Sequence, residues 1–257
     1  MYIDTHAHPH MDGYQIPAEE FFNLAKASRV EKVIAVGTSA KDSENAIAFA
    51  NENDNCFASV GLHPHDSKDF AKEKERLGEL AKQPGVVAIG ECGLDYYYLH
   101  SDKNDQITAL TYQIELALEN NLPMIFHVRN ADGNTQAFDD FFEIIDKYNH
   151  ISGVVHSFTA GESTMEECVK RGLYIGLNGI MTFSKDESQL EAARSVPLDR
   201  LLLETDSPFL TPAPFRGKVN HSGHIKIVAE FLAKLRGEEL SDLAKVTSDN
   251  AKEVFNL

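Results

Sequence analysis

Short apolar runs alternate along the chain with longer stretches in which apolar residues recur at helical spacing. The runs are rich in Val, Ile and Leu, which is typical of strands buried on both faces of a parallel sheet. This alternation predicts an α/β fold. Eight runs are predicted as strands: Met1–Asp4, Lys32–Gly37, Cys56–Gly61, Val86–Gly90, Leu122–Phe126, Ile151–Val155, Leu173–Gly176 and Leu201–Glu204.

Most segments between these runs are predicted as amphipathic helices. They are Ala18–Arg29, Lys103–Asn120, Thr135–Tyr148, Ser163–Arg171, Ser188–Val196, Ile225–Arg236 and Ser241–Phe255. Strands that alternate with helices indicate a parallel sheet, and eight such units predict closure into a TIM-like (β/α)8 barrel with parallel strands and outer helices. An open, doubly wound sheet is the alternative topology.

The length and composition fit one folded domain. A β/α barrel takes about 250 residues, so the 257 residues predict a single domain over positions 1–257. A hydrophobic fraction of 42% excludes wholesale disorder. No run of about 18 apolar residues occurs, so no membrane span is predicted. No long amphipathic interface element stands out either, and we therefore expect a monomer.

The net charge and the cysteines bear on the class of substrate and on the cellular location. The net charge of −16 disfavours broad electrostatic binding of nucleic acid. It does not exclude a nuclease in which bound cations provide the local positive charge. Cys56, Cys92 and Cys168 form no CxxC pair, and the first residues lack the basic segment of a signal peptide. We therefore expect a reducing, cytoplasmic location.

Histidines follow the first and third predicted strands. His6 and His8 are two residues apart, so in a strand their side chains point the same way and converge. Asp4 lies one step deeper on that side, where it is placed to orient a ligand. After the third strand, His63 is a candidate for contact with a substrate oxygen, while His65 is either a supporting residue or an ordinary loop residue. A polar surface turn is the alternative for each pair.

A carboxylate follows the fourth predicted strand directly. Glu91 follows a buried apolar run, and a carboxylate in that position is costly unless it is paired or bound to metal. Its two oxygens can bridge two cations. Strand alternation turns Cys92 away from Glu91, so we interpret Cys92 as a packing residue, and Asp95 as a residue that braces the following loop.

Strands five, six and eight end in the same way. His127 and His156 each follow an apolar run directly, which makes them candidate ligands. Arg129 is placed either to meet an anionic substrate or to pair with a carboxylate. Asp206 is predicted to ligate metal and to hold the attacking water, with Glu204 one step deeper as a partner for a ligand.

The set as a whole indicates a catalytic metal centre, because catalytic groups of a β/α barrel gather at the carboxyl ends of its strands. Histidine and carboxylate ligands without cysteine suit divalent ions such as Mg²⁺, Mn²⁺ or Zn²⁺. No serine or cysteine nucleophile and no Gly-rich phosphate loop is evident, so metal-activated water is the expected nucleophile. Six candidate ligands favour two ions about 3.5–4 Å apart. They are His6, His8, Glu91, His127, His156 and Asp206.

These motifs resemble, nearly end to end and in order, the TatD family of metal-dependent deoxyribonucleases within the amidohydrolase superfamily. The resemblance implies one metal on His6, His8, Glu91 and Asp206, and a second on Glu91, His127 and His156. It further implies catalytic roles for Asp206, Glu91 and His63, phosphate contacts from His63 and Arg129, and hydrolysis of DNA, often from the 3′ end of single strands. The matching motifs include 61–65, 90–97, 204–212, 216–220 and 250–255.

Three loops near the mouth of the predicted site depart from the family pattern. They lie after His156, after Asn220, and at Tyr98 to His100, where a basic residue is usual. The predicted ligands are unaffected, so the departures concern substrate preference. Two alternatives follow: a metal-dependent hydrolase of a small amide, lactone or phosphoester, and a non-enzymatic binding protein that retains the barrel.

Overall fold

The computed structural model describes all 257 residues. Every predicted strand overlaps an observed one. The strands are β1 (Tyr2–Ala7), β2 (Val30–Val36), β3 (Cys56–Val60), β4 (Val86–Asp95), β5 (Met124–Arg129), β6 (Gly153–Val155), β7 (Tyr174–Leu177) and β8 (Leu201–Leu203). The helices are α1 (Ala18–Ala27), α2 (Ala40–Glu52), α3 (Phe70–Leu80), α4 (Lys103–Asn120), α5 (Gln136–Ile145), α6 (Glu162–Lys170), α7 (Glu187–Ser195), α8 (Ile225–Arg236) and α9 (Leu240–Phe255).

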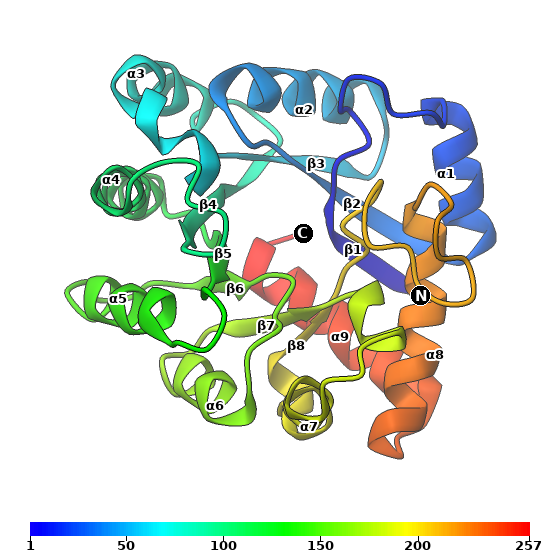
Figure 1. Ribbon diagram of the computed structural model, residues 1–257. Coiled ribbons are helices and arrows are strands. Elements are labelled where there is room, and N and C mark those ends of the chain that lie inside the picture. Colours follow the sequence, from blue (N-terminus) through cyan, green and yellow to red (C-terminus); the bar gives the residue numbers. More distant parts are fainter.

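The eight strands form one parallel sheet in chain order, with the helices arranged around it (Figure 1). The sheet closes where β1 meets the residues that follow β8. The amide of Asp206 donates to the carbonyl of His6 at 2.8 Å, and that of His8 donates to Ser207 at 2.7 Å. The predicted TIM-like (β/α)8 barrel is confirmed, and the open sheet is wrong. Because these closing bonds lie at the carboxyl end of the strands, they also join two parts of the predicted site.

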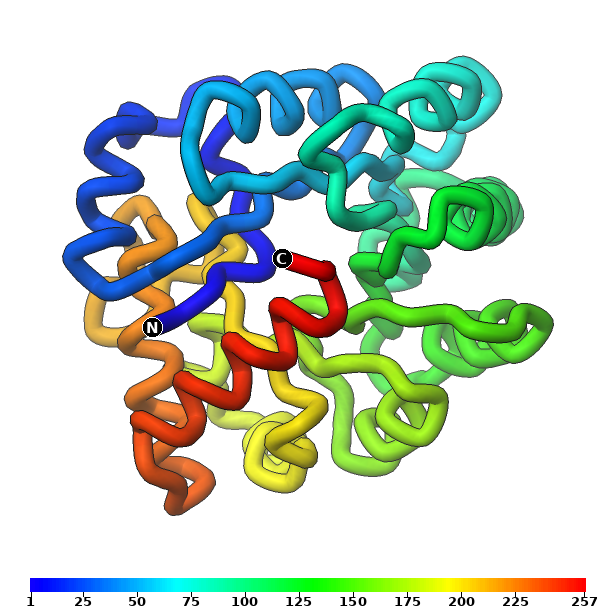
Figure 2. Tube along the Cα trace, turned by 180° about the vertical axis from the view of Figure 1, so that it is seen from behind, coloured from blue at the N-terminus to red at the C-terminus, as the bar shows by residue number.

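The interior of the barrel is packed with side chains and sealed at one end by α9. Inward-pointing residues of the strands, such as Ile34, Ile125 and Leu202, form one cluster with Val254 and Phe255 of α9. Seen from behind, the red C-terminal helix crosses the barrel opening and ends near its centre (Figure 2). The sequence predicts this helix but not its position. The amino-terminal end of the barrel is therefore closed, which leaves the carboxyl end as the accessible face.

The outer face of the sheet packs against the helices in a core of 49 buried residues. Two helices, α2 and α3, lie in segments for which the sequence predicts no element. The buried face of α2 consists largely of Ala and Ser, and α3 buries only Leu77 and Leu80 among many charged residues. Neither helix has the strong apolar periodicity that sequence reasoning requires. None of the helices is long and apolar enough to cross a membrane.

Strands β4 and β5 extend beyond the apolar runs that predict them. The run Val86–Gly90 is only the first half of β4, which continues to Asp95 and pairs Gly93 with His127 of β5. The predicted β5, Leu122–Phe126, likewise stops before the polar end of the strand. Polar side chains thus stand within paired strands, where the rigid sheet determines their positions.

Candidate metal centre

The structure brings all six predicted ligands together at the carboxyl end of the barrel. His6, Glu91 and His127 lie within strands β1, β4 and β5, whereas His156 follows β6 directly and Asp206 lies three residues after the end of β8. His8 comes just after β1. Residues that are up to 200 positions apart in the chain therefore meet because parallel strands end at one face of the barrel.

One group of donor atoms forms around His6 and His8. Their Nε2 atoms are 3.2 Å apart, and they lie 3.7 and 3.4 Å from Oδ1 of Asp206. The Oε2 atom of Glu91 completes the group at 3.3 Å from Nε2 of His6. All four side chains are largely buried, so few water molecules can solvate their polar atoms.

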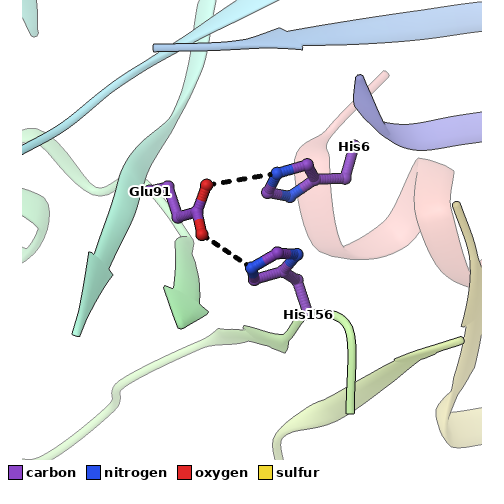
Figure 3. A group of neighbouring side chains, drawn as sticks. All are labelled: His6, Glu91 and His156. Carbon is purple, nitrogen blue, oxygen red and sulfur yellow. Dashed lines mark ion pairs between the residues drawn. The ribbon is translucent and has the colours of Figure 1, made fainter. Parts of the chain in front are cut away.

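A second group forms on the other side of Glu91. Its Oε1 atom lies 2.7 Å from Nε2 of His156 and 2.9 Å from Nδ1 of His127. Figure 3 shows the Glu91 carboxylate facing the rings of His6 and His156, with one oxygen directed at each. Glu91 therefore presents one oxygen to each group, which is the arrangement that a carboxylate shared by two cations requires.

Residues behind the ligands orient their rings. Nδ1 of His8 lies 2.7 Å from the carbonyl oxygen of Val36, which only accepts, so Nδ1 carries a proton and a neutral ring has its lone pair on Nε2. Nε2 of His127 lies 3.0 Å from Oδ2 of Asp95. This is the support that metal-bound histidines commonly receive from a carbonyl or carboxylate.

The second supporting carboxylate is Glu204, which is fully buried. Its Oε1 atom lies 3.6 Å from Nδ1 of His156 and accepts a hydrogen bond of 2.7 Å from the amide of Ser157. The sequence interpretation of Glu204 as a partner for a ligand agrees with this geometry. Asp4 differs from its expected position, because it contacts neither the His6 ring nor the His8 ring. It accepts instead from the amide and hydroxyl of Thr205 and so ties β1 to the segment after β8.

The electrostatics of the centre favour a bound cation. Burial raises the pKa of Glu91, but the neighbouring imidazoles, that of His156 foremost, outweigh it and hold the pKa well below its usual value. Burial likewise raises the pKa of Asp206, and the adjacent His8 ring outweighs it. Two ionised carboxylates and several imidazole nitrogens thus converge in a buried space. Such a donor set fits divalent metal ions.

The two residues predicted to contact phosphate, His63 and Arg129, line a cleft above the candidate ligands. The volume of this cleft is about 920 Å³. The backbone amide of His65 donates to Nδ1 of His63, which leaves the ring proton on Nε2, 3.4 Å from Glu91. Burial lowers the pKa of His63 to about 4, so the ring is neutral near pH 7. Arg129 makes no ion pair with any carboxylate; its guanidinium lies over the rings of Tyr97 and Tyr98 instead. Both residues therefore offer N–H groups to an anion in the cleft.

The sequence interpretation of Asp95 as a loop brace covers only half of its contacts. Oδ1 accepts from the amides of Tyr97 and Tyr98, which braces the loop as expected. Oδ2 lies within hydrogen-bond distance of both His127 and His65, a role that the sequence interpretation missed. The alternation of Glu91, Gly93 and Asp95 with buried Cys92 and Leu94 is the signal that extends β4 far enough to find it.

Comparison with known proteins identifies the family. The model of the family described as TatD related DNase matches residues 3–256. The chain belongs to the TatD family. It is 38% identical to a relative named as an uncharacterized metal-dependent hydrolase, YabD of Bacillus subtilis, with all of both chains covered. It is 33% identical to the 3′-5′ ssDNA/RNA exonuclease TatD of Escherichia fergusonii, over 93% of each chain.

A solved structure of the TatD family agrees with the fold. The TatD homologue YjjV of Escherichia coli superposes with a TM-score of 0.90 at 28% identity, and the match covers 100% of this chain and 98% of that one. The predicted resemblance to the TatD family is thus confirmed, and the protein is a metal-dependent hydrolase of that family. The buried His, Glu and Asp side chains at the carboxyl end of the barrel bring donor atoms close enough together to hold a metal ion.

Proposed function

We propose that the protein hydrolyses phosphodiester bonds of DNA, acting from the 3′ end of single strands, with two divalent ions held on either side of Glu91. The observation that carries this proposal is the Glu91 carboxylate, with Oε2 facing His6 and Oε1 facing His127 and His156. One ion would be held by His6, His8, Glu91 and Asp206, and the other by Glu91, His127 and His156. A relative that is named a 3′-5′ ssDNA/RNA exonuclease supports the choice of substrate.

Bound divalent ions supply Lewis acidity, which brings the pKa of water toward neutrality and stabilises charge on phosphoryl oxygens. The protein residues then have separate tasks. The Asp206 carboxylate is placed to take a proton from the attacking water, because its low pKa keeps it ionised. Nε2–H of His63 and the guanidinium of Arg129 are placed to donate to the phosphate. Water attacks phosphorus, and the bond to one flanking sugar oxygen breaks.

The net charge of −16 favours a second candidate, hydrolysis of a small amide, lactone or phosphoester. A substrate panel distinguishes the two. We expect an end-labelled single-stranded oligonucleotide to be shortened stepwise from its 3′ end with Mg²⁺ or Mn²⁺ and to stay intact with EDTA. Turnover of a lactone or phosphotriester with no shortening of the oligonucleotide would replace the proposed function with the second candidate.

Replacing Arg129 with Ala should lower kcat/KM on the oligonucleotide by about 10- to 100-fold, because a charge-assisted hydrogen bond contributes about 1.5–3 kcal/mol. Steady-state kinetics measures this change. Arg200→Ala is the matched control, since Arg200 also lies over a tyrosine ring, that of Tyr174, but before β8 at the opposite end of the barrel. Equal kinetics for the two variants would remove Arg129 from substrate binding.

A further inference from the structure

Exposed aromatic side chains stand at the rim of the cleft. Only five large apolar side chains of the chain are strongly exposed, and Tyr98 and Phe209, each about half exposed, are two of them. Both line the cleft. An exposed aromatic ring at the edge of a polar cleft offers a flat face on which a base can stack. The proposed phosphate contacts do not use the ring of Phe209, and they use only the face of the Tyr98 ring over which Arg129 lies.

Tyr98 is held rigidly on the side of the second donor group. Its backbone amide donates to Oδ1 of Asp95 at 2.8 Å, and its ring lies 5.5 Å from the ring of His65. The guanidinium of Arg129 lies 4.8 Å from the centre of the Tyr98 ring. Since Asp95 also contacts His127, one carboxylate fixes both the Tyr98 backbone and a ring of the metal centre.

Phe209 is held in the same manner on the opposite side of the centre. Its amide donates to the carbonyl of Asp206 at 2.8 Å, and its own carbonyl accepts from the Asn220 side chain at 2.6 Å. The Phe209 ring lies 6.2 Å from that of His8, beside the first donor group. A second guanidinium without a carboxylate partner, that of Arg216, also lines this part of the cleft. Each rim thus combines an aromatic ring on a fixed backbone with an unpaired arginine.

We propose that Tyr98 and Phe209 are stacking platforms for two unpaired bases, one on each side of the phosphate that is bound at the metal centre. The inference rests on the proposed function and specifies its substrate as single-stranded nucleic acid of any base sequence. Aromatic stacking is available to every base, and it contributes to binding without a broad basic surface. This suits a chain with a net charge of −16, in which two arginines supply the cations of the cleft.

Stacking on these rings requires bases that are free of partners. An interior base of a duplex uses both faces to stack on its neighbours, and a terminal base uses one face and is also paired, so a blunt duplex end cannot occupy both platforms without fraying. The proposal therefore expects a single strand to have a lower KM than a blunt duplex of the same sequence. It also expects this difference to shrink when either ring is removed.

The test compares two 5′-labelled single strands, one with ordinary 3′-terminal nucleotides and one with abasic 3′-terminal nucleotides. Tyr98→Leu and Phe209→Leu should each raise KM for the ordinary strand about 10- to 100-fold. Neither should change KM for the abasic strand by more than about twofold, because no base is present to stack. Tyr98→Phe keeps the ring and should behave as the wild type. Leu99→Ala, an exposed neighbour outside the cleft, is the control.

The outcomes separate this inference from the proposed function. If the wild type shortens the strand and the leucine variants raise KM equally for both strands, or for neither, the stacking platforms are overturned and the nuclease stands. If the wild type shortens no strand with any metal ion, the proposed function fails, and the stacking proposal fails with it.

Discussion

Glu91→Gln should lower the rate of oligonucleotide hydrolysis by about 10³-fold or more, while the protein stays folded. Glutamine keeps the shape of the side chain but has no negative charge, and its amide nitrogen cannot bind a cation. One of the two donor groups around Glu91 therefore loses the Glu91 oxygen that faces it. Both groups lose the negative charge of the carboxylate that they share. The measurement is the rate at saturating substrate, together with the metal content of the purified variant.

The matched control is Glu166→Gln, which removes a carboxylate from an exposed position on α6. It should have the activity and metal content of the wild type. Wild-type activity and metal content in Glu91→Gln would contradict the central role of this carboxylate. A normal circular dichroism spectrum in both variants excludes misfolding as the reason for a loss.

Gly93→Ala should produce the largest loss of stability among single methyl additions, about 3 kcal/mol or more. Gly93 has a φ of +150°, and a Cβ atom there would lie 1.9 Å from the carbonyl oxygen of His127. The Cβ atom is bonded directly to the backbone of β4, and the oxygen belongs to the backbone of β5, so neither moves without separating the two paired strands. The same separation would pull Glu91 away from His127, and activity should fall with stability.

Urea unfolding of Gly93→Ala beside Gly172→Ala measures this effect. Gly172 has a φ of +81°, but nothing lies within 4 Å of the position of its Cβ, so this control isolates backbone strain from the clash. Gly172→Ala should lose about 1–2 kcal/mol. Equal unfolding midpoints for the two variants would show that the close approach of β4 and β5 does not constrain position 93.

The barrel was predictable because strands buried on both faces form apolar runs, and eight of these alternate with helical periodicity. The cluster of candidate ligands was predictable for a related reason: His127 and His156 interrupt the apolar pattern where each run ends. The helices α2 and α3 were not predictable. They cover the barrel with small residues in α2 and with few apolar residues among charged ones in α3, so neither helix shows an apolar stripe in the sequence. Packing against the sheet rather than local periodicity determines those two helices.

The remaining differences arise from three-dimensional contacts. The position of α9 across the barrel end depends on Val254 and Phe255 meeting interior residues that are remote in sequence. The alternation along β4 extends that strand to Asp95, but the contact of Asp95 with His127 also depends on the register of β4 against β5, which no local pattern contains. Sequence therefore predicts which residue types end the strands, and the sheet register decides which of them meet.

The most direct test of the central claim is a titration of metal-free protein with Mn²⁺, in which bound metal and hydrolysis of a single-stranded oligonucleotide are followed together. The account predicts no hydrolysis without metal, two ions bound per chain, and a rate that reaches its maximum only as the second ion binds. Full hydrolysis by the metal-free protein, or with a single ion bound, would contradict a centre in which Glu91 is shared by two ions.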